Sequence, residues 1–148
     1  VRKAKKNLLS LFRAVDKGLP LPLRGIDNRR DLLYVGNLVA AMIHAMSMPS
    51  HLCGTYYVSD GQAVSVPELV RQIANALDRP SRLLPVPLFF LRGLGAASGK
   101  SELIKRLMGS LEIDSNTFCQ VTNWNPPFAM KEGLAQTAAW YLSHKSND

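Results

Sequence analysis

Stretches that favour β-structure are few in this sequence, and each of them is short. Residues 32–35 and 55–59 have strand-like composition, prolines hold residues 82–87 extended, and a bridge is expected near residues 112–113. Sheets of globular proteins usually contain about four to six strands, so these segments cannot build a sheet of that size on their own. The sequence therefore predicts a helix-rich, mixed α/β fold in which residues 1–148 form a single lobe of something larger.

Helices are predicted from apolar side chains that recur at helical spacing. The first covers residues 3–17, carries one broad apolar stripe and ends at Gly18. The clearest start is Ser65, which forms a capping-box pattern with Glu68 and is followed by Pro67 in the first turn. Further helices are expected at 38–48 with Asn37 as the cap, from 88, at 101–108, from 114 or 115 to 121, and at 131–145.

The length and the cysteine count exclude several classes of protein. A chain of 148 residues can bury a core without disulfides or metal, and Cys53 and Cys119 have no metal-ligand spacing. Two reduced thiols are typical of a cytoplasmic protein. The apolar runs are too short to cross a bilayer, and no secretory signal pattern follows the basic start.

Positive charge is concentrated at the beginning of the chain. Residues 1–30 hold nine of the 18 basic side chains and two acidic ones, which accounts for the whole net charge of +7. A solvated helix face explains such a pattern, and so does an anionic partner. The anions to consider are nucleic acid, an acidic membrane surface and a small phosphate ester.

Several motifs that suggest catalysis do not have the context that the chemistry requires. Residues 93–101 are rich in glycine but have the spacing of neither phosphate-binding loop. Tyr141 and Lys145 match a two-residue dehydrogenase pattern close to the end of the chain, where chance explains the match. No histidine has the spacing of a metal ligand or a catalytic triad, so His44 is expected to be hydrogen bonded at the edge of the core, and neither catalytic nor metal-binding residues are predicted.

Five segments, in this order, resemble the C-terminal half of the extended short-chain dehydrogenase/reductase family. The family contains NAD-dependent nucleotide-sugar epimerases and dehydratases of the UDP-glucose 4-epimerase kind. The segments are Lys6-Asn-Leu-Leu9, Gly18-Leu-Pro-Leu-Pro-Leu23, Arg30-Asp-Leu-Leu-Tyr-Val-Gly-Asn-Leu38, Gly54-Thr-Tyr-Tyr-Val-Ser-Asp-Gly61, and Asp114-Ser-Asn116 with Asn123-Trp-Asn-Pro-Pro127. The resemblance spans nearly the whole chain.

The resemblance implies a lobe that binds the nucleotide diphosphate of a UDP- or dTDP-sugar. In such enzymes an N-terminal Rossmann half binds NAD and supplies the catalytic tyrosine and lysine, and neither has a counterpart here. The chain alone is therefore expected to hold no cofactor and to be inactive, with that half, and a second copy of the chain, as candidate partners. The implied substrate-binding residues are Asn7 and Leu8 near the pyrophosphate, Leu21 and Leu23 at the base, Arg30 on phosphate oxygens, and Arg106 as a substitute for a second arginine whose place Gly109 takes.

Physical chemistry supports some of these roles and leaves alternatives open. A guanidinium offers phosphate a planar donor fork, and a helix start attracts anions. Arg30 could instead pair with Asp27 or Asp31, and Asn7 could simply cap a helix. Relatives usually have aspartate at the place of Asn37 and often histidine at that of Tyr34. A different class of function, a basic module for nucleic acid or an acidic protein, is less favoured because the first 30 residues contain no aromatic platform for bases besides Phe12.

Overall fold

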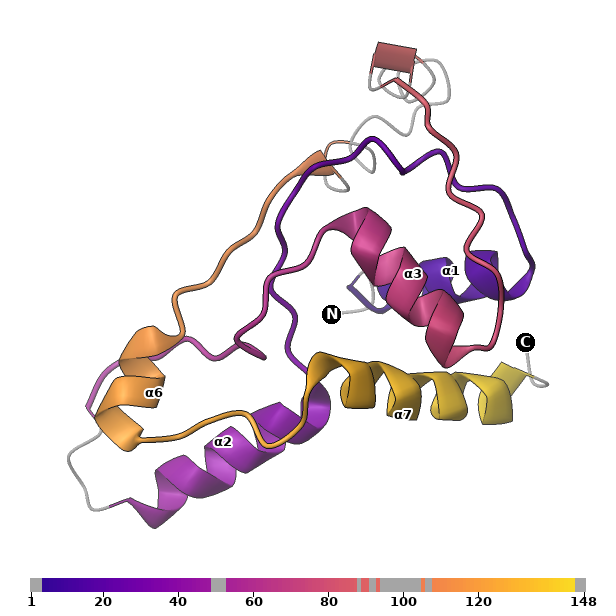
Figure 1. Cartoon of the computed structure of the whole chain (residues 1–148). Helices are drawn as coiled ribbons and strands as arrows, with labels where there is room; N and C mark the ends of the chain where they lie inside the picture. The colour runs from indigo at the N-terminus through magenta and orange to yellow at the C-terminus, as the bar shows by residue number, and fades with distance from the viewer. Residues whose placement is uncertain are drawn as a thin grey trace.

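The helices are the main regular elements of the chain (Figure 1). The computed structural model describes residues 4–48, 53–87, 89–90, 93, 105 and 108–145, with the side chains of residues 4–7 left out. Its helices are α1 (Ala4–Asp16), α2 (Val35–Ser47), α3 (Val66–Ala76), α6 (Asn116–Thr122) and α7 (Met130–His144). The predicted α/β class is confirmed in its helix-rich form, and the helices expected at 3–17, 114–121 and 131–145 are confirmed to within about two residues.

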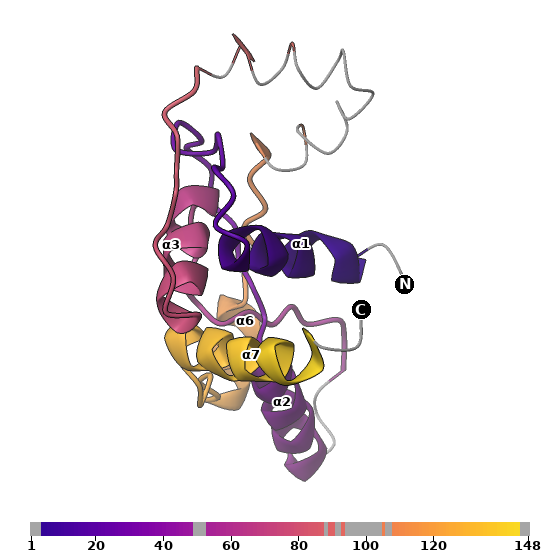
Figure 2. The same ribbon diagram turned by 90° about the vertical axis from the view of Figure 1, so that its right-hand side faces the viewer.

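Helices α1, α3 and α7 enclose the main core. Helix α3 packs against both of the others, and the two views show α1 lying above α7 beside it (Figures 1 and 2). Among the large apolar side chains of this core, Phe12 of α1 and Val70 and Ile73 of α3 are at most 1% exposed. Tyr141 of α7 lies beside Phe12, with 5.8 Å between the ring centroids. The apolar stripe predicted for the first helix therefore faces the core.

The predicted strands at 32–35 and 55–59 are wrong for this chain. Within the described residues only isolated bridges occur, joining Leu21 to Leu83, Arg30 to Val64, and Arg30 to Leu111. The extended segment 82–87 is confirmed, and the bridge expected at 112–113 lies one residue earlier. A strand is stabilised by its neighbours in a sheet, and the described chain supplies none beside residues 55–59.

Helix α2 begins earlier than the sequence predicts. Its first residue is Val35 and its N-cap is Tyr34, so Asn37 lies inside the helix and is not the cap. Pro49, the expected stop, lies outside the described residues. In the helices predicted from 88 and at 101–108, positions 89, 90, 93, 105 and 108 are helical and the others lie outside the described residues.

A second, smaller cluster holds α2 and α6 together. It consists of Ala41, Phe118 and Trp124, with Tyr56 and Val58 packed against it. His44 of α2 is hydrogen bonded to the Thr122 carbonyl at 2.9 Å, as predicted for a residue at the edge of the core. Helix α2 extends away from the main core (Figure 1).

Two predictions from composition can also be compared with the structure. Cys53 and Cys119 are both free thiols. Among the described residues, no helix combines the length and the apolar character needed to cross a bilayer.

The capping box predicted at the start of α3 consists of two hydrogen bonds, and one of them is present. The Ser65 hydroxyl accepts a hydrogen bond from the Glu68 amide at 3.3 Å, whereas the Glu68 carboxylate pairs with Arg71 instead of returning to the cap. We expect Ser65→Ala to lower the free energy of unfolding by about 1 kcal/mol. Urea denaturation measures this, with Ser47→Ala, which removes an exposed hydroxyl at the end of α2, as the control. Equal effects of the two substitutions would contradict the role of Ser65.

Candidate functional site

Arg30 lies where three extended segments meet. Its backbone exchanges two hydrogen bonds of 2.9 Å with Val64, and the Asp31 amide donates to the Leu111 carbonyl at 2.9 Å. The Leu111 amide in turn donates to the carbonyl of Arg29 at 2.8 Å. Segments distant in the sequence therefore fix the Arg30 backbone on both sides.

The Arg30 side chain is half-buried and keeps its donors available. Within the described chain, the guanidinium has no ion-pair or hydrogen-bond partner. Asp31 accepts a hydrogen bond of 2.6 Å from the Ile113 amide, and Asp27 is exposed. The alternative that Arg30 pairs with Asp27 or Asp31 is therefore wrong.

Arg29, the neighbour of Arg30, is engaged instead. Its Nε lies 3.1 Å from a Glu112 carboxylate oxygen, and both side chains are more than half exposed. Successive side chains of an extended segment point to opposite faces, so Arg29 and Arg30 serve different surfaces. Of these two arginines, Arg29 has a carboxylate partner among the described residues and Arg30 does not.

Leu21 and Leu23 border the main core. The Leu21 side chain is half-buried and packs against it, and Leu23 is 7% exposed within it. The Leu21 amide donates to the Arg82 carbonyl and the Leu23 amide to the Leu21 carbonyl, both at 2.8 Å. The amides of these two residues are thus already hydrogen bonded within the chain.

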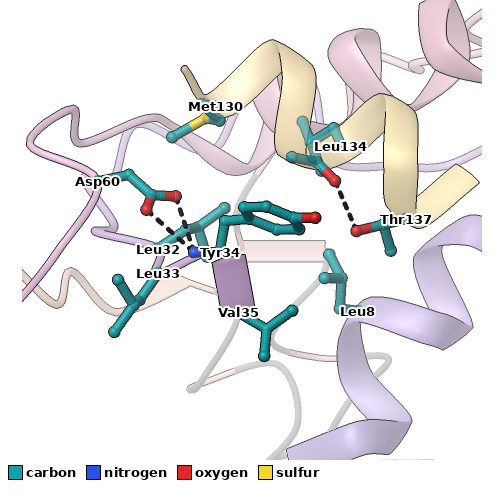
Figure 3. Close-up of a pocket in the computed structure, with 10 residues that line it drawn as sticks. Leu8, Leu32, Leu33, Tyr34, Val35, Asp60, Met130, Leu134 and Thr137 are labelled. Atoms are coloured by element: carbon teal, nitrogen blue, oxygen red, sulfur yellow. Dashed lines mark hydrogen bonds between the residues drawn. The ribbon is translucent and has the colours of Figure 1, made fainter. Parts of the chain in front are cut away.

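Leu8 contributes to a small apolar pocket of about 210 Å³ (Figure 3). The pocket lies between the start of α2, the first turns of α7 and α1, and includes neither Arg30 nor Leu21 nor Leu23. Its other lining residues are Leu32, Leu33, Tyr34, Val35, Asp60, Met130, Gly133, Leu134 and Thr137. The structure therefore places Leu8, Leu21 and Leu23 against one core but does not bring them into one pocket with Arg30. Asn7 lies in α1 without a described side chain, and Arg106 lies outside the described residues.

Tyr34 lines that pocket, and its role was not predicted from the sequence. Its ring lies against α7 (Figure 3), where a Cβ added to Gly133 would be 2.8 Å from the ring carbon Cγ. Glycine is unfavourable inside a helix, so its presence at 133 is explained by the close approach of Tyr34. The ring also meets Phe128 edge-on, with 5.6 Å between the centroids. A glycine in the middle of an otherwise helical pattern was the available signal.

Asn37 joins three segments through its buried amide. Nδ2 donates to Asp60 Oδ1 at 2.7 Å and to the Phe128 carbonyl at 2.9 Å, and Oδ1 accepts from the Phe128 amide at 3.0 Å. Asp60 also accepts from the Tyr34 amide at 3.0 Å. Asp60 therefore places its carboxylate at the start of α2, which disfavours a second anion there.

At the other well-described helix starts, one backbone amide is likewise hydrogen bonded to a side chain of the chain. Ser65 caps α3, and the Glu132 carboxylate accepts from the Ala129 amide at 2.9 Å at the start of α7. Within the described part of the chain, no group of three or more metal-ligating side chains occurs. Residues 94–101, most of the glycine-rich motif, lie outside that part.

Comparison with known proteins gives two relatives. The chain is 40% identical over 139 residues to the C-terminal part of a UDP-glucose 4-epimerase from Vibrio cholerae. This chain is homologous to part of a 4-epimerase. The resemblance found in the sequence is therefore confirmed. The chain is also 23% identical over 154 residues to an N-acetyl-alpha-D-glucosaminyl-diphospho-ditrans,octacis-undecaprenol 4-epimerase from Escherichia coli O157:H7.

The coverage of these matches is unequal. They include 93% and 96% of this chain, but only 42% and 46% of the two epimerases. The chain thus spans less than half the length of the curated relatives it matches. No family model matches the chain, and no solved structure does.

The tyrosine and lysine near the end of this epimerase-related chain have a structural role. The Tyr141 hydroxyl donates to Asp16 Oδ2 at 3.1 Å, and Lys145 forms an ion pair with the same carboxylate. Burial, with the Asp16 carboxylate beside it, raises the pKa of Tyr141. Because both side chains meet at Asp16, they link α7 to the end of α1.

Proposed function

We propose that the chain is the nucleotide-diphosphate-sugar-binding lobe of an NAD-dependent sugar epimerase or dehydratase. The observation that carries the proposal is the 40% identity to a UDP-glucose 4-epimerase over 93% of the chain. The substrate is then a nucleotide sugar such as a UDP- or dTDP-sugar. The excess of positive charge in residues 1–30 supports a partner that carries phosphate.

In this proposal Arg30 binds the diphosphate. Its guanidinium is half-buried, has no carboxylate partner among the described residues, and projects from a backbone that Val64 and Leu111 hold in place. Charge-assisted hydrogen bonds to phosphate are about twice as strong as neutral ones. Because the backbone of Arg30 is already held in place, less conformational entropy is lost on binding than from a mobile loop.

The remaining contacts are proposed from the resemblance. Leu21 gives apolar contact to the base, beside Leu23. Asn7 and Leu8 of α1 lie near the pyrophosphate, and Arg106 supplies a second positive charge. These residues bind and orient the nucleotide, and we assign none of them to catalysis.

The cofactor belongs to another part of the enzyme in this proposal. NAD, when bound, accepts a hydride from the sugar and returns it. At each of the described starts of α2, α3 and α7 one backbone amide is already hydrogen bonded to a side chain, that of Asp60, Ser65 or Glu132. We expect the purified chain to convert no UDP- or dTDP-sugar when NAD is added, and turnover by the chain alone would contradict this expectation.

Titration of the chain with UDP, followed by calorimetry, tests the proposed role of Arg30. We expect Arg30→Ala to weaken UDP binding at least about 10-fold, because a charge-assisted pair is lost. The matched control is Arg29→Ala, which removes the same charge from the neighbouring position, where Glu112 is the partner. Equal effects of the two substitutions would remove Arg30 from the site.

The same titration separates a nucleotide site from a general polyanion surface. A nucleotide site should bind UDP more tightly than inorganic pyrophosphate at equal concentration. A basic module for nucleic acid should instead bind single-stranded DNA with an affinity that falls steeply as salt is added. Preference for single-stranded DNA, together with no selection of UDP, would overturn the proposal.

A further inference from the structure

Two proline-rich segments run side by side along one edge of the molecule. They are residues 17–26, which follow α1, and residues 79–87, which come after α3, and both views show them at the same edge (Figures 1 and 2). The Leu21 amide donates to the Arg82 carbonyl and the Leu84 amide to the Leu21 carbonyl, both at 2.8 Å. The Arg24 amide donates to the Leu84 carbonyl at 3.3 Å. These bonds join the two segments into one strip, which we call the proline-rich edge.

The proline-rich edge carries positive charge and no carboxylate of its own. Residues 17–26 and 79–87 contain four basic side chains and neither Asp nor Glu. The four basic residues are all exposed, namely Lys17, Arg24, Arg79 and Arg82. Arg79 lies 3.6 Å from Asp16, whose side chain is nearly buried, and the acidic residues Asp27 and Asp78 only flank the two segments. The charge that the edge presents to solvent is therefore mainly positive.

The same edge exposes large apolar side chains. Leu19 is 49% exposed and Leu84 is 45% exposed. Just beyond residue 87, Phe89 and Phe90 are 66% and 54% exposed, with 4.1 Å between their ring centroids. The Phe90 amide donates to the Pro87 carbonyl at 3.0 Å, which holds the two rings at the end of the edge. Exposed apolar groups that are bordered by charged residues mark a surface of interaction.

This combination suits a lipid bilayer better than nucleic acid or a protein strand. Lysine and arginine attract anionic headgroups, while phenylalanine and leucine enter the boundary beneath them. Single-stranded nucleic acid would use the cations and the aromatic rings but would leave Leu19 and Leu84 in water. An added polypeptide strand needs free backbone donors, whereas the two segments contain five prolines and already use the amides of Leu21, Arg24 and Leu84 between themselves.

We propose that the proline-rich edge binds the surface of a bilayer that contains anionic lipids. Phe89 and Phe90 enter the region between headgroups and acyl chains. The four basic side chains pair with lipid phosphates, and their aliphatic stems lie along the apolar groups of the edge. The contact is peripheral and requires no helix that crosses the membrane. It does not depend on the nucleotide site, so failure of UDP binding would leave this inference intact.

Co-sedimentation of the 148-residue chain with lipid vesicles tests the proposal. We expect at least about 10-fold stronger binding to vesicles of phosphatidylcholine and phosphatidylglycerol, mixed at about 3:1, than to vesicles of phosphatidylcholine alone, because several basic residues meet the anionic surface. Equal binding to the two kinds of vesicle would overturn the proposal. Binding of single-stranded DNA at the same salt concentration, without binding to the acidic vesicles, would also overturn it.

Arg24→Gln tests the contribution of charge at the edge. We expect it to weaken binding to the acidic vesicles about 5-fold, which is the effect of one basic residue near such a surface. The matched control is Lys131→Gln, which removes one positive charge from the exposed start of α7. Lys131 lies roughly 20 Å along the helix from Lys145, the residue that reaches Asp16 beside the edge. Equal effects of the two substitutions would show that net charge alone decides binding and would overturn the proposal.

Phe89→Ala tests the apolar contribution. We expect it to weaken binding to the acidic vesicles at least about 5-fold, because an apolar ring no longer leaves water on binding. The control is Tyr57→Ala, at a ring that is 65% exposed but lies outside the edge, and its binding should be unchanged. Both side chains are exposed, so the unfolding midpoint should change little in either variant. Unchanged binding by the Phe89 variant would leave only a general attraction of charges and would overturn the proposal.

Discussion

Asp16→Ala is expected to lower the free energy of unfolding by about 3 kcal/mol, near the lower end of the range for breaking a buried ion pair. The Asp16 side chain is 2% exposed and interacts with Lys145, with Arg79 Nε at 3.6 Å and with the Tyr141 hydroxyl at 3.1 Å. It joins the end of α1 to the end of α7 and to Arg79, which lies three residues beyond the end of α3. Lys145 and Arg79 are about half exposed, so water partly replaces their lost partner. The buried Tyr141 hydroxyl is left without its acceptor.

Denaturation in urea at pH 7 measures the effect of Asp16→Ala. The matched control is Asp78→Asn, at an exposed residue in a left-handed turn that asparagine also tolerates, where the change should stay within about 0.5 kcal/mol. Similar losses for the two variants would contradict the structural role of Asp16.

The contribution of Asp16 should also depend on pH. The hydrogen bond from Lys145 lowers the pKa of this carboxyl below its ordinary value of 3.8, against the opposing effect of burial, with further help from Tyr141 and Arg79. A carboxyl whose pKa is lower in the folded state stabilises the protein above the ordinary pKa, and that stabilisation is lost as the pH falls through the lower value. The difference between the wild type and Asp16→Ala should therefore be constant from about pH 5 to 7 and shrink below pH 3.8. A difference that grows in acid would contradict this.

The sequence predicted the helices that bury one face and did not predict which extended segments would form strands. The stripe of residues 3–17 and the cap at Ser65 are local signals, and each determines its helix almost alone. Residues 55–59 have the composition of a strand, but a strand also needs a partner, and within the described chain none lies beside them.

The candidate site could be predicted only in part, because its geometry also depends on contacts between distant segments. The guanidinium at position 30 could be singled out from the sequence as a phosphate ligand, but its register against Val64 and Leu111 depends on segments that are distant in the chain. The approach of Tyr34 to Gly133 likewise depends on tertiary packing, so only the glycine itself was visible beforehand. Local patterns determine helices, whereas the surroundings of a side chain are determined by contacts over long sequence separations.

Asn37→Asp is expected to lower the free energy of unfolding by about 3 kcal/mol at neutral pH. The Asn37 amide is completely buried and gives two hydrogen bonds, to Asp60 at 2.7 Å and to the Phe128 carbonyl at 2.9 Å. In the variant a carboxylate oxygen replaces the donor and faces both acceptors. A buried acceptor that loses its donor costs about 1–3 kcal/mol, and the repulsion between two carboxylates adds to that.

Acid should reduce the destabilisation by Asn37→Asp, because one shared proton between the carboxylates at 37 and 60 restores a donor and removes a charge. Unfolding in urea at pH 7 and at pH 4.5 measures this, with Asn75→Asp on the exposed side of α3 as a control that should change little at either pH. A loss that is the same at both pH values would show that the charge on residue 37 is not the cause. Asn37, together with Asp60 and the Phe128 backbone, thus holds the start of α2 against the segment that precedes α7, and the loss of stability measures this junction.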